Sequence, residues 1–150
     1  MPAATLGAVE KQAIADNKAL WVEMRSPDGP IFAGLCRTIT VPGSKGAFGV
    51  LVRHAPLMSS LDVGLTKVET SDGNELRFVT GAGFVEVQNN RVLLLVDFAE
   101  PTDAIDVVRA QDALARAKTR LRNATEEVDT ARAEAAMQRA TTRLRYAKRV

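Results

Sequence analysis

Histidine and cysteine are almost absent from this sequence of 150 residues, which contains one of each, His54 and Cys36. A single cysteine cannot close a disulfide within the chain or complete a structural zinc site, and this usage is typical of a reducing compartment. A single histidine excludes a two-histidine metal site and makes any Ser-His-Asp triad depend on His54 alone. The surrounding residues, Arg-His-Ala-Pro, offer no nucleophile at a recognisable spacing. We therefore interpret His54 as a loop residue that hydrogen-bonds within its own turn, and we predict no catalytic residue and no metal site.

An excess of one charge and a long apolar run are also missing. The chain has 20 Lys and Arg against 18 Asp and Glu, which argues against a polybasic nucleic-acid binder and against an acidic tail. The longest apolar run, Val92 to Val96, has the length of a strand, whereas a membrane helix needs about 20 apolar residues. Residues 1–19 contain Glu10 and Asp16 but no Arg and no apolar block, which is unlike a secretory signal or a transit peptide. We expect them to form a short N-terminal extension with a helical turn or two.

Short β-rich runs separated by regular turns follow in residues 20–101. Leu20, Val22 and Met24 stand at alternate positions, as in a strand with one buried face, and a Ser-Pro-Asp-Gly turn comes next. The expected strands cover residues 20–26, 32–41, 48–52, 65–70, 75–80, 84–88 and 91–98. Because no helical segment intervenes to make parallel crossovers, the pattern predicts an antiparallel β-sandwich or barrel.

Alanine replaces the β-branched residues after Pro101, which predicts helices in residues 102–150. Thr102 or Asp103 is the expected cap of a first helix that runs to about residue 122, with Asp103 and Asp106 complementing the dipole of its first turn. Thr125 is the expected cap of a second helix, which has acidic residues in its first turn and basic residues in its last. The basic residues expected in that last turn are Arg145, Lys148 and Arg149.

The two expected helices form an antiparallel hairpin whose seam consists largely of alanine. Larger apolar residues stand at a few of its positions, namely Ile105, Val108, Leu114, Leu121, Val128, Met137 and Leu144. Burying one methylene stabilises a fold by only about 0.8 kcal/mol, so we expect the hairpin to be the least stable part of the chain. By content the chain is α+β, with an N-terminal antiparallel β-sandwich in residues 20–101 and a C-terminal two-helix antiparallel hairpin in residues 102–150.

Positive charge gathers in the hairpin. From Asp103 to Val150 eleven Lys and Arg stand against seven Asp and Glu, and residues 139–149 contain basic residues but no acidic one. A basic amphipathic helix is most often a solvated face, and it otherwise fits an acidic protein partner, a membrane surface or a nucleotide. Nucleic acid is the least favoured partner, because Tyr146 is the one aromatic residue of this region and offers no stacking platform.

Three segments carry a resemblance to a known family. Residues 41–51 read Val-Pro-Gly-Ser-Lys-Gly-Ala-Phe-Gly-Val-Leu, and His-Ala-Pro-Leu follows at 54–57. Residues 81–87 read Gly-Ala-Gly-Phe-Val-Glu-Val, and residues 126–147 run from Glu-Glu-Val-Asp to Leu-Arg-Tyr-Ala. In this order, over about residues 20–148, the chain resembles the epsilon subunit of the rotary F-type ATP synthase, which is called delta in mitochondria.

The resemblance implies a sandwich of about ten strands followed by the helical hairpin, in a non-catalytic subunit of the central stalk, the rotor of this proton-translocating enzyme. Such a subunit binds the gamma subunit, rests on the ring of c subunits and helps couple c-ring rotation to the alpha/beta catalytic head, without a required cofactor. The implied rotor contacts are Gly43, Gly46, Gly49 and His54. Val52-Arg53 stands where the family commonly has a Pro-Gly pair. The implied location is peripheral, on the cytoplasmic face of the bacterial inner membrane and attached through the complex alone, with a plastid or mitochondrial equivalent as the alternative.

The resemblance also implies two roles for the hairpin. In bacterial and chloroplast relatives it swings from a compact state to one extended along gamma, which blocks ATP hydrolysis. The implied contacts with an acidic loop of the catalytic beta subunits are Arg132, Arg139, Arg143 and Arg145. Some bacterial relatives bind a regulatory ATP through an Ile/Leu-Asp-x-x-Arg-Ala motif, which this chain has complete. The implied ATP-binding residues are Glu100, Ile105, Asp106, Arg109, Ala110, Arg139 and Arg143.

The spacing of Asp106 and Arg109 predicts that the two share a helix face, with Arg109 on a phosphate and Asp106 on the nucleoside. The alternative is an ordinary surface pair, with the arginines serving the beta subunit. Two functions of other classes also stay open. A stand-alone enzyme would have to use paired carboxylates without histidine. A non-catalytic β-sandwich adaptor, whose hairpin binds an acidic protein partner, would differ from a rotor subunit in failing to bind gamma.

Overall fold

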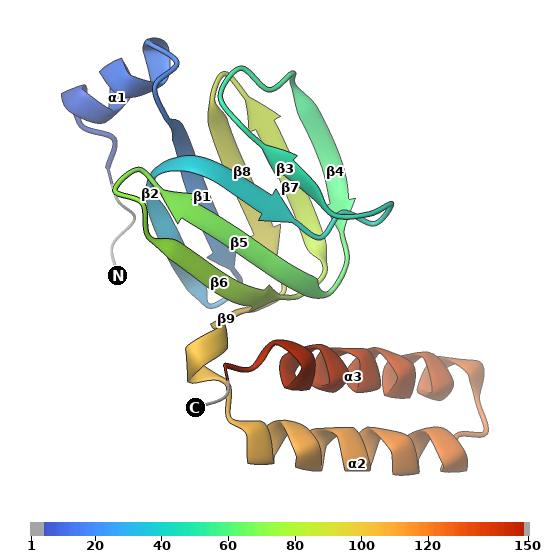
Figure 1. The fold of residues 1–150 in the computed structure, drawn as a ribbon. Coiled ribbons are helices and arrows are strands. Elements are labelled where there is room, and N and C mark those ends of the chain that lie inside the picture. The colour runs from blue at the N-terminus through green and yellow to red at the C-terminus, as the bar shows by residue number, and fades with distance from the viewer. Residues whose placement is uncertain (1–4, 149–150) are drawn as a thin grey trace. The chain divides into compact units, whose positions relative to one another are not determined.

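Alternating hydrophobic residues build the β-rich part of the molecule. The structure is a computed structural model that describes residues 5–148, and the chain divides between residues 99 and 100 into two units. Within the described residues there are nine strands, one fewer than the ten expected (Figure 1). They are β1 Leu20–Ser26, β2 Gly29–Val41, β3 Phe48–Val50, β4 Leu57–Leu61, β5 Gly64–Thr70, β6 Glu75–Thr80, β7 Gly83–Gln88, β8 Arg91–Val96 and β9 Ala99–Pro101.

The strands follow the order β4-β7-β8-β1-β2-β5-β6-β9, and β3 pairs with β2. Strand β2 has 13 residues and pairs with β1 along its first part and with β5 and β3 along its last part. It therefore passes from one layer of the sandwich to the other. The prediction of a purely antiparallel sheet was wrong at one place, because β1 and β8 run parallel from Trp21↔Arg91 to Arg25↔Leu95. Strands, and no crossover helix, connect β1 to β8 along the chain. No pattern in the sequence therefore indicated a parallel pair.

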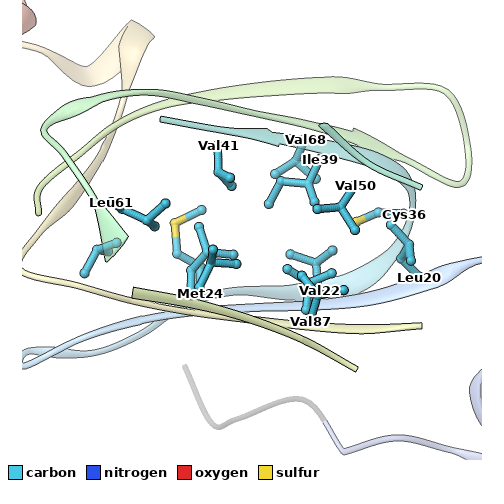
Figure 2. Packing of buried hydrophobic residues seen from close by; sticks show 14 of the residues in the cluster. Leu20, Val22, Met24, Cys36, Ile39, Val41, Val50, Leu61, Val68 and Val87 are labelled. Carbon is cyan, nitrogen blue, oxygen red and sulfur yellow. The ribbon is translucent and has the colours of Figure 1, made fainter. Parts of the chain in front are cut away.

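The core lies between the two layers. Leu20, Val22 and Met24 of β1 are fully buried, as their alternation predicted. Figure 2 shows side chains of β2, β3 and β5 opposite those of β1 and β7. Cys36 of β2 is part of this core, and burial raises the pKa of its thiol to about 12. The thiol therefore stays protonated at neutral pH and behaves as a small apolar side chain.

Two of the strands were not predicted from the sequence. Strand β4 follows Pro56 and contains two adjacent serines, which lowers its β signal, yet all five of its residues pair with β7. Strand β9 has three residues, and pairing with β6 rather than its own composition makes it a strand. The run predicted at 48–52 ends at Val50, and the run predicted at 91–98 ends at Val96.

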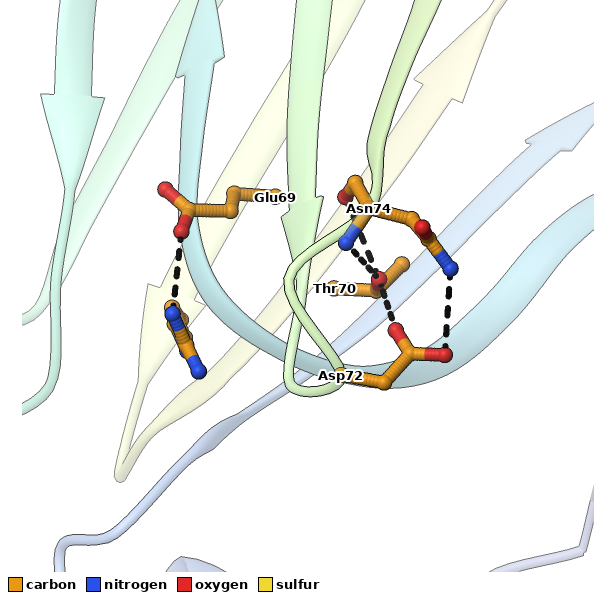
Figure 3. Close-up of polar contacts among 5 residues, drawn as sticks. Glu69, Thr70, Asp72 and Asn74 are labelled. Carbon is orange, nitrogen blue, oxygen red and sulfur yellow. Dashed lines mark hydrogen bonds and ion pairs between the residues drawn. The ribbon is translucent and has the colours of Figure 1, made fainter.

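The turn between β5 and β6 is held by its own polar side chains. Figure 3 shows the hydroxyl of Thr70 and the amide of Asn74 donating to the carboxylate of Asp72. The hydrogen bond from Thr70 is the main reason why the pKa of Asp72 lies below its usual value. Gly73 has φ +91°, a conformation in which a Cβ would be strained. A turn thus forms at residues 71–74, between two of the expected strands, and Glu69 beside it pairs with Arg37 of the neighbouring strand.

The N-terminal extension contains a helix, α1 (Ala8–Ala15), which agrees with the expected helical turn or two. Ile14 in its last turn is buried, and Ala19 just before β1 is buried as well. Asn17 between them has φ 56°, so the chain turns sharply there. This helix is therefore anchored to the sandwich unit through its C-terminal end.

The second unit contains a short 3-10 helix, η1 (Thr102–Ala104), and two α-helices, α2 (Val107–Asn123) and α3 (Glu127–Tyr146). The predicted caps were wrong by a few residues. Asp106, rather than Thr102 or Asp103, caps α2, and its Oδ1 accepts from the backbone N–H of Arg109 at 3.0 Å. Ile105 causes this shift, because it is extended and buried and so separates η1 from α2.

Glu126, rather than Thr125, occupies the N-cap position of α3. The last turn of α3 carries Arg143 and Arg145, while Lys148 lies past the helix end and donates from its backbone N–H to Thr102. Arg149, which was also predicted for the last turn, lies outside the described residues. Among residues 5–148, no helix is both long enough and apolar enough to span a membrane.

Alanine forms the seam of the hairpin. The buried residues of the two helices are Ala110, Ala117, Ala133 and Ala140. On each helix the two alanines are seven residues apart, which is about two turns. They therefore lie on the same face of the helix, and this face packs against the partner helix. The larger residues Val108 and Val128 were predicted for the seam but are exposed, because at 3.6 residues per turn each lies on a side of its helix that faces away from the buried alanines.

Candidate functional site

An arginine-lined groove of about 520 Å³ runs over the helical hairpin. Its walls come from α2, from α3 and from the segment that precedes α2. The lining residues are Glu100, Ala104, Asp106, Arg109, Ala110, Ala113, Arg116, Ala117, Arg120, Ala136, Arg139, Ala140 and Arg143. All of them belong to the second unit. Small alanines thus make the floor of the groove, and long cationic side chains make its rim.

Two of the residues that line the groove form an ion pair. Nε of Arg143 donates to Oε2 of Glu100 at 2.9 Å, and the two side chains are 28% and 31% exposed. Arg143 lies in the last turn of α3, and Glu100 lies ahead of η1. The pair therefore connects the two ends of the second unit, alongside the backbone hydrogen bond from Lys148 to Thr102.

Charge is distributed unequally in the groove. Two carboxylates, Glu100 and Asp106, share it with five guanidinium groups, those of Arg109, Arg116, Arg120, Arg139 and Arg143. Guanidinium groups bind phosphate through two parallel hydrogen bonds, which is geometrically selective. The excess of guanidinium groups over carboxylates suits an anion with several phosphates better than a neutral ligand.

Six of the seven residues predicted for ATP line this single groove, although they come from three parts of the sequence. The exception is Ile105, whose side chain is buried. Asp106 and Arg109 line the same groove, as their spacing predicted, but Asp106 does so as the N-cap of α2, where its carboxylate accepts from the backbone N–H of Arg109. Asp106 thereby fixes where α2 begins, and so helps to place Arg109 in the lining of the groove.

The sequence analysis missed Arg116 and Arg120 as lining residues. Arg116 follows Arg109 by seven residues and Arg120 follows by four more, which is the spacing of one helix face. That periodicity was available in the sequence, but only the position of α3 shows that this face borders the groove.

The arginines predicted for the catalytic beta subunits are spread over the hairpin. Arg139 and Arg143 line the groove described above. Arg132 lines a second groove nearer the turn between the helices, together with Arg120 and Arg139. Arg145 is exposed in the last turn of α3.

The residues predicted for the rotor contact lie in the first unit. Nδ1 of His54 donates to the carbonyl of the adjacent Ala55 at 2.7 Å, which confirms a loop histidine bonded within its own turn. At Gly43 a Cβ would lie 2.7 Å from the carbonyl oxygen of Gly46, so this position requires glycine. Gly46 has φ +127°, whereas a Cβ at Gly49 would meet its nearest neighbour at an ordinary 3.9 Å. Arg53 has φ 65°, a backbone conformation that costs less free energy for glycine, the residue common in the family at this position, than for arginine.

Comparison with known proteins identifies the family. The model of the ATP synthase delta/epsilon chain β-sandwich domain matches residues 19–102, and that of the delta/epsilon chain long alpha-helix domain matches residues 103–148. The chain belongs to the delta/epsilon chains of ATP synthase. It is therefore a non-catalytic subunit, and the resemblance seen in the sequence is confirmed, as are the sandwich and the hairpin.

Relatives of this family are similar over most of the chain. The ATP synthase epsilon chain of Lawsonia intracellularis is 45% identical over 108 residues, which cover 72% of this chain and 80% of the relative. The epsilon chain of Pelotomaculum thermopropionicum is 38% identical over 109 residues, with 73% and 81% covered. A chain in the Euglena gracilis mitochondrial ATP synthase has the same fold, with a TM-score of 0.73, 23% identity and coverage of 83% of this chain and 78% of that one.

Proposed function

We propose that this chain is a rotor subunit whose helical hairpin restrains ATP hydrolysis, and that ATP bound in the hairpin groove relieves this restraint. The observation that supports the proposal is the convergence of Glu100, Asp106, Arg109, Arg139 and Arg143 on one groove. Residues from both helices and from the preceding segment face the same space. A ligand there would bridge α2 and α3.

The alanine seam makes such a bridge effective. The helices bury mainly methyl groups against each other, so the paired hairpin has little apolar area to stabilise it. A ligand that binds only the paired form stabilises it by about 2.7 kcal/mol at a hundredfold excess over its Kd. ATP at such a level would hold α3 against α2 and would oppose any extended form in which the helices separate.

The phosphates of ATP would lie among Arg109, Arg139 and Arg143, whose guanidinium groups can each donate twice. Arg143 already donates to Glu100, so a phosphate would share or replace this partner. The carboxylate of Asp106 would accept a hydrogen bond from the nucleoside. The groove would supply binding and no chemistry.

We propose the catalytic beta subunits as the partner of the extended hairpin. Arg132 and Arg145 are exposed, and neither of them lines the proposed ATP groove. Exposed ion pairs contribute only about 0–1 kcal/mol each, so several arginines would have to act together. The same exposed arginines would serve the second candidate function, that of a sandwich adaptor whose hairpin binds an acidic protein partner but which does not bind gamma.

The sandwich is the proposed attachment to the rotor. Its outer surface exposes Met58 of β4, Phe84 of β7 and Leu95 of β8, and Phe84 and Leu95 are direct cross-strand neighbours. Exposed apolar groups that lie together on one face are typical of a protein interface, and we propose the gamma subunit as the partner there. The His54 loop and the turn from Gly43 to Gly49 are the proposed contacts with the c-ring. Association with the cytoplasmic face of a bacterial inner membrane would then be indirect, through the complex.

The test is ATP hydrolysis by the cognate catalytic head with the full chain and with a chain truncated after Thr102. We expect faster hydrolysis with the truncated chain while its binding to gamma persists. Unchanged hydrolysis would contradict the inhibitory role and leave the hairpin as an attachment. Isothermal titration of the isolated full chain with ATP tests ligand binding in the groove separately. If the full chain does not bind gamma, the adaptor function is favoured instead.

A further inference from the structure

A buried asparagine amide joins three segments of the first unit that are far apart in sequence. Asn90 lies in the turn between β7 and β8 and is 7% exposed. Its Nδ2 donates to the carbonyl oxygen of Ile14 at 3.1 Å and to Oδ1 of Asn17 at 2.7 Å. Its Oδ1 accepts from the backbone N–H of Arg53 at 2.7 Å. One side chain thus contacts the end of α1 and the loop between β3 and β4.

The backbone is in the left-handed region at Asn90 and at two of its three partners, Asn17 and Arg53. The φ angles are 56° at Asn17, 65° at Arg53 and 59° at Asn90. Asparagine tolerates this region because its short side chain can bond locally, but arginine does not. Arg53 is therefore held in an unfavourable conformation, and the hydrogen bond from its N–H to Asn90 is a contact that favours this conformation.

The bond to Arg53 shapes the loop that carries His54. The backbone N–H of His54 donates to the carbonyl of Leu51 at 3.2 Å, which closes a turn with Arg53 inside it. Fixing the N–H of Arg53 from outside thus fixes the direction in which the next residue leaves the turn. His54 is half-buried and follows immediately.

We propose that Asn90 is a positioning residue through which helix α1 sets the conformation of the loop formed by residues 51–56. The two acceptors beside α1 orient the amide group, because Nδ2 can satisfy both of its N–H groups only with Oδ1 turned toward Arg53. Without these acceptors the buried amide would lose its partners and turn toward water. The N-terminal extension then acts as a brace for the loop. The coupling between α1 and the loop of residues 51–56 does not depend on the proposed function. Only the further step, that this coupling serves the rotor contact, rests on the proposed function.

Two matched substitutions test the coupling in the full chain. Asn90→Gly removes the amide and keeps the left-handed backbone, and Asn89→Gly is the control, since Asn89 stands in the same turn with φ 52° and an exposed side chain. The readout is amide hydrogen exchange at Arg53 and His54, followed by NMR. We expect exchange at Arg53 to be at least tenfold faster in Asn90→Gly and unchanged within twofold in Asn89→Gly.

Asn17→Gly tests the part played by the N-terminal segment. It also keeps a left-handed backbone and removes one acceptor of the Asn90 amide. We expect at least threefold faster exchange at Arg53, with the amide of Val22 in the core unchanged as a check on folding. Unchanged exchange at Arg53 in Asn17→Gly, or in Asn90→Gly, would overturn the proposal. Binding of the same variants to a gamma and c-ring complex reports separately on the rotor contact, so a loop that loosens without weaker binding refutes that contact and not the coupling.

Discussion

Arg143 donates from Nε to Oε2 of Glu100 at 2.9 Å and so joins the last turn of α3 to the segment ahead of α2. The two residues are separated by 43 positions in the sequence. Their side chains are about two-thirds buried, so solvent screens the pair only in part. The same guanidinium lines the arginine groove, which means that the structural contact and the proposed ligand site share a group.

Loss of this pair should destabilise the second unit modestly. We expect Arg143→Ala to lower the free energy of unfolding by about 1 kcal/mol, and a double-mutant cycle with Glu100→Ala to give a coupling of about 0.5–1 kcal/mol. Urea denaturation followed by helical circular dichroism measures both. Arg145→Ala, in the same helical turn but exposed, is the matched control and should have little effect. Equal effects of the two arginine variants would argue against a specific contribution of the pair.

Arginines of the groove should control ATP binding. We expect Arg139→Ala to weaken ATP binding at least tenfold, which corresponds to about 1.4 kcal/mol, because a bidentate phosphate contact is lost. Isothermal titration of the full chain at constant ionic strength is the measurement. Arg122→Ala removes an equal charge from an exposed position of α2 that does not line the groove. If Arg122→Ala weakens binding as much, general attraction by the positive hairpin explains the affinity and the groove does not.

The alanine seam should not accept larger residues. Ala117 of α2 is 2% exposed, and Ala117→Leu would force the helices apart at a cost of about 1–3 kcal/mol. Thermal unfolding monitored at the helical signal should show a lower transition for this variant. Ala115→Leu, on the exposed side of the same helix, should leave the transition almost unchanged. A neutral Ala117→Leu would mean that α2 and α3 are not closely packed in solution.

Glycine at position 53 should stabilise the chain. Arg53 has φ 65°, which costs a non-glycine residue about 1–2 kcal/mol, while glycine loses about 0.5–1 kcal/mol more backbone entropy on folding. The expected net gain for Arg53→Gly is therefore about 0.5–1 kcal/mol, seen as a Tm that is higher by a few degrees. The backbone bond to Asn90 is kept in this variant. A lower Tm would show that the arginine side chain stabilises the loop by more than its backbone conformation costs.

Stability should fall at high pH because of Cys36. Burial raises the pKa of this thiol from 9.0 to about 12, so between these values the unfolded chain loses a proton that the folded chain keeps. The proton count is then lower in the unfolded state, and the free energy of unfolding decreases by at most about 1.4 kcal/mol per pH unit from pH 9 to 12. Urea denaturation at several pH values, compared with Cys36→Ala, isolates this contribution. An identical pH dependence in the two proteins would contradict it.

Some of the candidate site was predictable because its residues are contiguous or periodic. The Ile105–Ala110 motif and the spacing of Arg139 and Arg143 are visible in the sequence, and their meaning came from resemblance to a family. Arg116 and Arg120 escaped because many exposed arginines have helical spacing, and periodicity does not say which face borders another helix. The cap of α2 was misplaced because Thr102, Asp103 and Asp106 are all good capping residues. Burial of Ile105 decides among them, and burial depends on the folded unit.

The sequence by itself determined the class of fold, the change from strands to helices near Pro101 and the charge of the hairpin, because alternation, alanine content and charge are local properties. Only the tertiary structure decided the parallel pairing of β1 with β8, the strand β4 and the junction at Asn90. These features join residues that are tens of positions apart. Their energies come from hydrogen bonds and packing that exist only once the chain has folded, and no local pattern encodes them.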